Sequence, residues 1–203
     1  MFSCRATLGP RPVGRISYVP VVTFISLIAI AVAMLFGPAS DAEALSVKRL
    51  TASVNACPGQ NDSSARPAAQ SRVMRCMFNF AREKRGLSRL KSSSQLDRSA
   101  RRKSGDIKRC GSFDHYACGR DFTFWMRQVG YARQCWTAAE NIAWGKGKNG
   151  NVRSIFVAWL KSPGHRANIL SRNYSAVGAG VRKGRFFGNR GSQVWTTHFG
   201  SHC

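Results

Sequence analysis

The sequence predicts an α+β fold in which helices pack against a mainly antiparallel sheet. Apolar residues recur at helical spacing in the segments before residue 130, whereas runs typical of strands begin only after residue 136. The connections between these segments are short, and no internal repeat or long linker interrupts them. Helices followed by strands with short connections are typical of one α+β domain.

The first 44 residues form an N-terminal extension that predicts a secretory signal peptide. Basic residues without an acid precede a charge-free apolar run from Val21 to Phe36, and Ala42-Glu43-Ala44 supplies a cleavage signal. An uncleaved membrane anchor is the alternative, because the apolar run with residues 17–20 approaches the ~20 residues that a span needs. The protein is therefore expected to be secreted or associated with the cell envelope.

Residues 45–69 follow the extension and are rich in Ser, Ala, Asn and Pro. We expect them to form an exposed lead-in that is pinned at Cys57, so that the folded domain spans residues 70–203. The apolar spacing in the first half of this domain, together with the helix-ending residues Gly86 and Gly130, predicts helices. The predicted helices cover residues 70–85, 94–108 and 122–129.

The second half of the chain alternates between strand and helix patterns. Apolar and β-branched residues predict three strands, over residues 137–145, 174–181 and 193–199. The turn-rich segment GKGKNGN leads from the first strand into an amphipathic helix over residues 152–161, which is expected to end at Pro163-Gly164. A glycine-rich hairpin is expected to join the last two strands.

Six cysteines lie outside the N-terminal extension: Cys57, Cys76, Cys110, Cys118, Cys135 and Cys203. An even number of cysteines in an exported chain predicts three disulfides. Among the fifteen possible connectivities, we favour Cys57 with Cys76 and Cys110 with Cys118 because each closes a short loop. Cys135 with Cys203 is then left by elimination and closes the longest loop. No pair forms CxxC, so a structural zinc site is not expected.

The net charge of +23 is extreme for 203 residues. A field of this size attracts polyanions without regard to their structure. The basic residues are spread over most of the chain and no recognised nucleic-acid-binding motif is present. For an exported monomer we therefore expect anionic cell-wall polymers, acidic polysaccharide or anionic lipid as partners. Charge-driven binding of any polyanion, nucleic acid included, and a merely compositional arginine excess are the alternatives.

Three ionisable side chains are the candidates for a cleft. His115 lies inside the loop that Cys110 and Cys118 would close, and His165 follows a Ser-Pro-Gly turn. Glu140 precedes an apolar run, so we expect its carboxylate to bind backbone amides or to have a pKa raised by burial. His198, inside a strand pattern, is interpreted as a core or edge histidine.

Four motifs carry these residues in a fixed order: AENIAWG, VAWLKSPGHRANIL, AVGAGV and QVWTTHFG. Their joint spacing, from about residue 70 to 200, resembles the CAP superfamily of cysteine-rich secretory, antigen 5 and pathogenesis-related proteins, and its bacterial secreted branch in particular. The resemblance implies a three-layer α-β-α sandwich. It also implies a cleft lined by two histidines, matched by His115 and His165, and by two acids, of which Glu140 matches one. Ser162 stands where the second acid is usual.

Three uses of these residues remain open. His115, His165 and Glu140 could hold a divalent metal such as Zn²⁺, which is the only cofactor we consider. Glu140 could act as general base, or Ser162 as a nucleophile activated by His165, in a peptidase-like hydrolase. The same side chains could instead form a polar network without turnover. A fold cannot supply a function, and the missing second acid leads us to favour a non-catalytic binding or interaction module.

Overall fold

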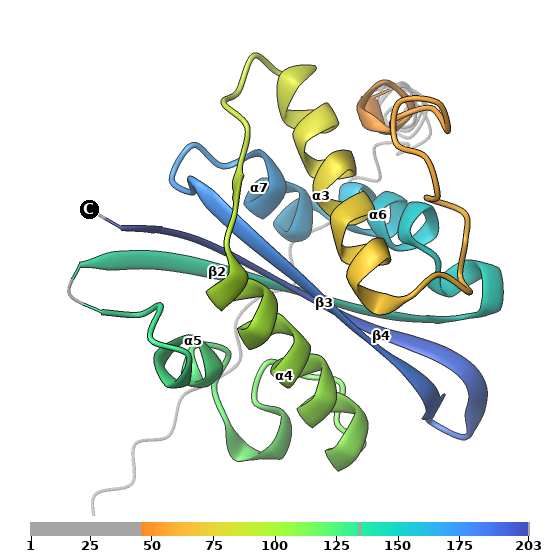
Figure 1. The fold of residues 1–203 in the computed structure, drawn as a ribbon, viewed down its shortest axis with the longest axis vertical. Helices are drawn as coiled ribbons and strands as arrows, with labels where there is room; N and C mark the ends of the chain where they lie inside the picture. Colours follow the sequence, from red (N-terminus) through yellow and green to blue (C-terminus); the bar gives the residue numbers. More distant parts are fainter. Residues whose placement is uncertain (1–45, 134, 203) are drawn as a thin grey trace, which may run out of the picture. The chain divides into compact units, whose positions relative to one another are not determined.

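A four-stranded sheet with the order β1-β3-β4-β2 forms the middle layer (Figure 1). The strands are β1 (Lys91–Ser92), β2 (Trp136–Lys146), β3 (Ala176–Phe186) and β4 (Asn189–His202). β2, β4 and β3 pair antiparallel, and the short β1 adds to β3 in parallel. The computed structural model describes residues 46–133 and 135–202.

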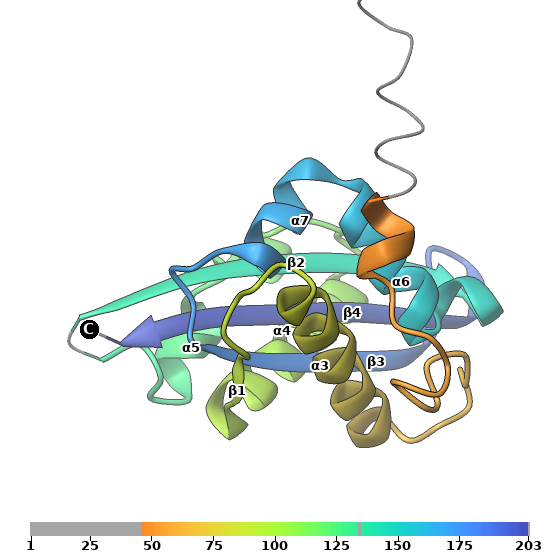
Figure 2. The same ribbon diagram turned by 90° about the horizontal axis from the view of Figure 1, so that it is seen from above.

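Helices cover both faces of the sheet, which gives the expected three layers (Figures 1 and 2). One face carries α3 (Pro67–Glu83), α6 (Val152–Lys161) and α7 (Pro163–Leu170). The other face carries α4 (Ser94–Cys110) and α5 (Phe124–Gln128). Two 3₁₀ turns, η2 (Ala117–Gly119) and η3 (Gly147–Gly150), complete the elements. The predicted helices and strands are present, with bounds that differ by a few residues.

The larger core lies between the sheet and the layer of α3, α6 and α7. Its aromatic centre consists of Phe78, Phe156, Trp159, Trp195 and Phe199, all buried. The two indole N–H groups are satisfied, since Trp159 donates to the carbonyl of Ile142 at 3.0 Å and Trp195 to that of Gly150 at 2.9 Å. This core fixes β2 and β4 against α6 and thereby holds the strand that carries Glu140.

The helix at residues 152–161 ends as expected, but the chain does not leave the helical layer there. Ser162 adopts an extended backbone (ψ 118°), which breaks α6, and Pro163 then occupies the first turn of the new helix α7. A proline is tolerated at this place because the first helical N–H groups have no partner within the helix. Pro163-Gly164 therefore starts a helix, and our prediction of a turn was wrong.

The prediction of an exposed lead-in over residues 45–69 was wrong in part. Residues 46–50 are helical, and Val47, Leu50 and Ala52 are buried in the larger core. Gln60 is also buried, and its side-chain amide donates to the carbonyls of Ser53 and Cys57. A few buried apolar residues are enough to hold this mostly polar segment against the core. The free energy gained depends on the apolar area that is buried and not on the overall composition of the segment.

Both predicted short disulfides are present, Cys57–Cys76 and Cys110–Cys118. Cys135 is also disulfide-bonded. Cys203 lies outside the described residues, so its pairing with Cys135 stays a prediction. The signal peptide or anchor at residues 1–44 lies outside them as well. Within the described part of the chain, no helix is long and apolar enough to cross a membrane.

Glycines on β3 allow α4 to lie directly on the sheet. A Cβ atom at Gly178 would come within 2.1 Å of the Leu96 carbonyl carbon, and one at Gly180 within 2.3 Å of the Arg101 backbone nitrogen. Backbone atoms of a packed helix cannot yield to such a contact without moving the helix. The two glycines therefore set the depth of α4, from which Ser99 and Lys103 reach the site.

We expect Gly180→Ala to lower the free energy of unfolding by about 1–3 kcal/mol or more, because the added methyl group displaces α4. Chemical denaturation followed by circular dichroism measures this loss. Gly164→Ala is the matched control, since a Cβ atom there meets nothing within 4 Å, and its effect should stay within ~0.5 kcal/mol. Equal stability of the two variants would show that α4 does not press on β3.

Candidate functional site

Glu140 is the centre of a hydrogen-bonded group at the edge of the sheet. It lies on β2, directly opposite His198 on the neighbouring β4. Residues opposite each other in an antiparallel pair point to the same face, here the face covered by α4. The Glu140 Oε2 atom lies 2.7 Å from Nε2 of His198, and both side chains are buried. Strand register alone thus places an acid beside an imidazole.

His115 binds the other oxygen of the same carboxylate. Its Nδ1 atom lies 2.7 Å from Glu140 Oε1, and 48% of its side chain remains exposed. The loop that carries His115 is closed by the Cys110–Cys118 disulfide. Lys103, fully buried on α4, donates to the carbonyl of His115 at 2.6 Å and to that of Arg120 at 3.1 Å. The disulfide and the lysine together fix the loop over Glu140.

Ser99 extends the group into the core. Its hydroxyl lies 2.6 Å from Nδ1 of His198, so a continuous chain runs Ser99–His198–Glu140–His115 from beneath α4 to the surface. An ionised carboxylate only accepts hydrogen bonds, so Nε2–H of His198 and Nδ1–H of His115 donate to Glu140. In its neutral form His198 then accepts from Ser99, and His115 turns Nε2 away from the carboxylate.

The charges of the group support this assignment. Burial raises the pKa of the Glu140 carboxyl, but the hydrogen bonds from His115 and His198, with the attraction of Lys103, outweigh burial and hold its pKa below the ordinary value. The hydrogen bond to Glu140 raises the pKa of His115. Burial lowers the pKa of Lys103, while nearby carboxylates oppose that change. Our expectation of backbone amide partners or a raised pKa for Glu140 was wrong, because imidazoles supply its partners.

His165 approaches the same edge of the sheet from the opposite helical layer. It lies in the first turn of α7, and Asn141 of β2 donates to its carbonyl at 3.0 Å. Asn168 in turn donates to the side-chain oxygen of Asn141 at 2.8 Å, which ties α7 to β2. Burial lowers the pKa of His165, and repulsion from His115 lowers it further. The two imidazoles therefore interact electrostatically across this edge of the sheet.

The residues do not fit a three-ligand metal site in this arrangement. Both oxygens of Glu140 face imidazole nitrogens, so the carboxylate has the role of orienting a histidine. Among the described residues, no three His, Cys, Asp or Glu side chains are grouped as a metal ion would need. Asp114, the acid next to His115 in the sequence, accepts hydrogen bonds within its own loop from Ser112 and from the backbone N–H of Tyr116.

The sequence singled out three members of this site and missed three others. His198 was interpreted only as a core or edge histidine, although its place opposite Glu140 makes it a partner of the carboxylate. Ser99 and Lys103 carry no sequence signal, because only the docking of α4 on the sheet brings them near. Ser162 makes no capping hydrogen bond, and within the described part of the chain no hydrogen bond joins it to His165.

We expect Glu140→Gln to lower the free energy of unfolding by about 2–3 kcal/mol, because two buried hydrogen bonds to a charge are lost. The contribution of Glu140, whose pKa is lowered, is present above its ordinary value of 4.5 and is lost as pH falls. The contribution to stability of His115, whose pKa is raised, is present below the ordinary histidine pKa of 6.5 and is lost as pH rises through the folded-state pKa. The difference between wild type and variant should therefore be largest between these two values.

Denaturation across this pH range measures the difference. Glu83→Gln, which removes an exposed carboxylate paired with Arg89, is the control and should cost less than ~1 kcal/mol. A loss for Glu140→Gln that does not change with pH would contradict an ionised carboxylate shared between imidazoles.

The histidine signals in NMR titrations should separate in a defined order. His115 should gain its proton at a higher pH than His165, because the pKa of the first is raised and that of the second is lowered. Glu140→Gln should lower the pKa of His115. Ser99→Ala, at the far end of the hydrogen-bonded series, should leave the order of the two histidine titrations unchanged. A reversed order in the wild type would refute the assignment.

Comparison with known proteins places the chain in a family. The family model described as "CAP: Cysteine-rich secretory protein family" matches residues 76–199. The uncharacterised protein YkwD of Bacillus subtilis is 37% identical over 126 residues, which cover 61% of this chain and 44% of YkwD. The chain thus matches less than half of that relative's length.

Solved structures agree on the fold. An extracellular protein containing a SCP domain from Bacillus anthracis superposes with a TM-score of 0.56 at 22% identity, over 66% of this chain and 40% of that one. An outer surface protein of Borrelia burgdorferi gives a TM-score of 0.56 at 16% identity, over 65% of this chain and 92% of that one. The family match covers more than half of the chain and includes every member of the site. The chain belongs to the CAP family of cysteine-rich secretory proteins.

Proposed function

We propose that this CAP domain is an exported binding module that holds its ligand at His115 and His165 without turning it over. The predicted signal peptide supports export, as do the extracellular and outer-surface descriptions of two structural relatives. The pairing of Glu140 with two imidazoles carries the proposal. A general base must present a lone pair to the attacking water, but the Glu140 side chain is only 1% exposed and both its oxygens already accept hydrogen bonds from His115 and His198.

The geometry gives the two outer histidines complementary roles in binding. Glu140 and the backbone contact from Lys103 hold His115 from two sides, so that its half-exposed ring presents Nε2 outward in a fixed direction. His165, whose pKa is lowered, supplies a neutral imidazole from the opposite layer. Such a pair suits a ligand with polar oxygen groups.

A hydrolase is the second candidate, because Ser99, His198 and Glu140 follow one another as the serine, histidine and acid of a catalytic triad do. Burial argues against turnover. Ser99 and His198 each have 0% exposed surface, so no substrate carbonyl can approach the hydroxyl. We infer that this hydrogen-bonded group orders the site: Glu140 fixes the tautomer of His198, and Ser99 satisfies the remaining ring nitrogen.

The proposal is tested by titrating the protein with soluble peptidoglycan fragments and, separately, with glycerophosphodiester headgroups while the histidine ring signals are observed by NMR. At least one probe should shift the signals of His115 and His165 and be recovered intact. His115→Gln and His165→Gln should each weaken binding roughly tenfold, the equivalent of one lost hydrogen bond. His202→Gln removes an imidazole elsewhere and is the control.

Cleavage of a probe by the wild type that is abolished in Glu140→Gln, with the fold intact, would support the hydrolase and refute the module. Binding that shifts neither histidine and survives both substitutions would also refute the proposed site.

A further inference from the structure

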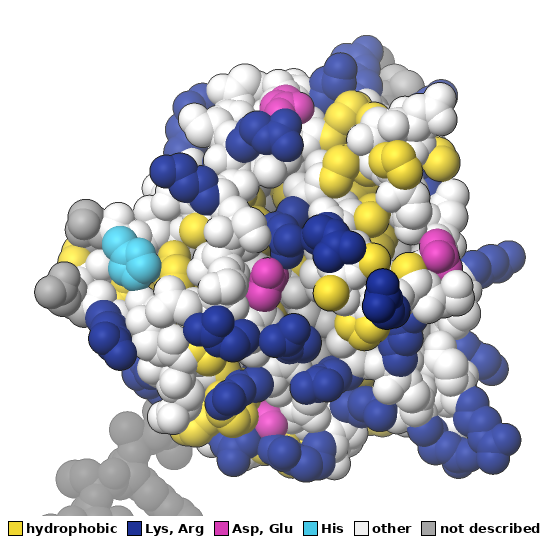
Figure 3. Space-filling model, viewed as in Figure 1, with side chains coloured by type: hydrophobic (Ala, Val, Ile, Leu, Met, Phe, Trp, Pro, Cys, Tyr) yellow, Lys and Arg dark blue, Asp and Glu magenta, His cyan; other side chains and the backbone are white. Residues whose placement is uncertain are grey.

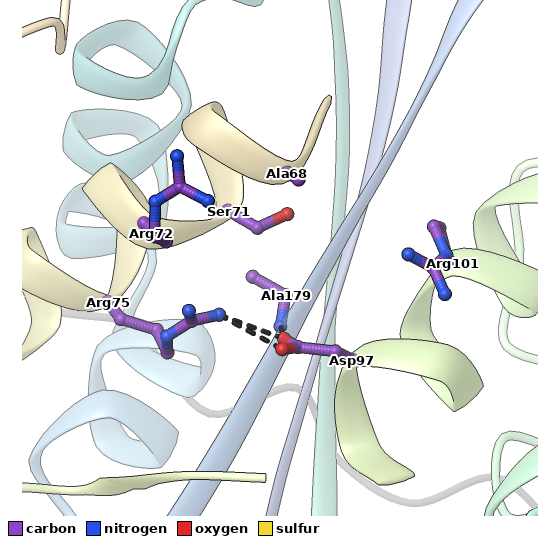
Figure 4. Close-up of a pocket in the computed structure, with 7 residues that line it drawn as sticks. All are labelled: Ala68, Ser71, Arg72, Arg75, Asp97, Arg101 and Ala179. Atoms are coloured by element: carbon purple, nitrogen blue, oxygen red, sulfur yellow. Dashed lines mark hydrogen bonds and ion pairs between the residues drawn. The ribbon is translucent and has the colours of Figure 1, made fainter. Parts of the chain in front are cut away.

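A separate basic surface lies on the side of the sheet farthest from β2. Figure 3 shows Lys and Arg side chains gathered over α3, α4 and β3, with few acidic side chains between them. Two cavities open on this surface. The first, of about 140 Å³, lies between α3 and α4 and is lined by Arg72, Arg75 and Arg101, with Asp97 in its wall (Figure 4). The second, of about 310 Å³, is lined only by basic residues and a glycine.

The two cavities are neighbours along β3. Arg101 lines the first and Arg182 the second, and Nε of Arg182 donates to the carbonyl of Arg101 at 3.2 Å. From Ala179 in the first cavity to Arg185 in the second, an extended strand covers roughly 20 Å. We call the cations that line the two cavities the cationic track: Arg72, Arg75, Arg101, Lys108, Arg109, Arg182 and Arg185.

Most of the track has no counter-charge. Arg75 pairs with Asp97 at 2.9 Å, and Asp97 also accepts the backbone N–H of Ala179 (Figure 4). Arg109 pairs with Asp106. For the other five cations, the described part of the chain provides no ion pair with a carboxylate. Like charges held together in this way repel one another. The binding of an anion along them is favoured because it relieves this repulsion.

Two glycines lie beside these cations. A Cβ atom at Gly184 would lie 2.5 Å from Nζ of Lys108, so the glycine lets the ammonium group rest against β3 in its present position. A Cβ atom at Gly105 would lie 3.7 Å from Nε of Arg182, within van der Waals contact. The backbone of α4 and β3 thus forms the floor of the second cavity, and the cations stand around it.

We propose that the cationic track binds an extended acidic polysaccharide, one carboxylate-bearing sugar after another. Guanidinium groups match carboxylates in a two-pronged geometry that fixes orientation as well as charge. Neither cavity is lined by an aromatic side chain, so the track has no surface on which nucleic-acid bases would stack. The linings also offer no large apolar wall for an acyl chain. A polymer recognised by evenly placed carboxylates fits these features best.

The test uses oligogalacturonides of increasing length, with binding measured by isothermal titration calorimetry at fixed ionic strength. Affinity should rise with length until the chain spans both cavities and then level off. The double variant R101Q/R182Q, which removes the two cations at the junction, should bind the long oligomer roughly tenfold more weakly, as two surface ion pairs predict. K161Q/R190Q loses the same charge outside the track and should change affinity by less than about twofold.

Circular dichroism of each variant monitors folding, and R72Q/R185Q, at the two ends of the track, replaces the first pair if that pair fails to fold. Equal losses for the on-track and off-track variants, or an affinity independent of length, would overturn the proposal. Single-stranded DNA or anionic phosphatidylglycerol vesicles that bind as tightly, with the same dependence on the track, would overturn it as well. H115Q/H165Q should bind the oligomer normally, so this outcome is independent of the histidine site.

Discussion

The shared carboxylate of Glu140 is the interaction on which the site depends. It joins β2 to β4 through His198, and it joins the sheet to the disulfide-closed loop through His115. A buried carboxylate is costly unless its oxygens are satisfied, and here two imidazoles satisfy them while the nearby Lys103 supplies a positive charge. Moving the β2–β4 register by one residue would turn Glu140 to the other face of the sheet. The register, the loop and the exposed histidine are thus set together.

The spacing of apolar residues was sufficient to predict the helices and strands, because it follows directly from helix and strand geometry. The three layers were implied by the family resemblance. The sandwich and two disulfides were predicted correctly. The errors arose where tertiary contacts override local signals. Pro163 starts α7 because an extended Ser162 separates it from α6, and Val47 and Leu50 are buried because the larger core has room for them. The two-residue strand β1 pairs only through β3 and carries no pattern of its own.

The site was predictable to the extent that motifs carry it. Glu140, His115 and His165 stand in recognisable surroundings, whereas Lys103 and Ser99 become partners only when Gly178 and Gly180 let α4 approach β3. A lysine within a run of exposed basic residues gives no sign that it will be buried. The absence of the second acid at Ser162 was visible in the sequence. The role of Glu140 as the acceptor shared by two imidazoles was not visible, because it depends on hydrogen-bond partners that other segments of the chain supply.

The start of α7 at Pro163 affects the chemistry at the β2 edge of the sheet. Peptide dipoles aligned in a helix leave a partial positive charge at its N-terminus, and His165 lies within the first turn of α7. This charge, like burial, disfavours a proton on its ring, while Glu140 favours one on His115. The two rings can therefore differ in protonation at one pH, with one imidazolium donor beside one lone-pair acceptor. A ligand group that both accepts and donates, such as an amide or a sugar hydroxyl, would complete that pair.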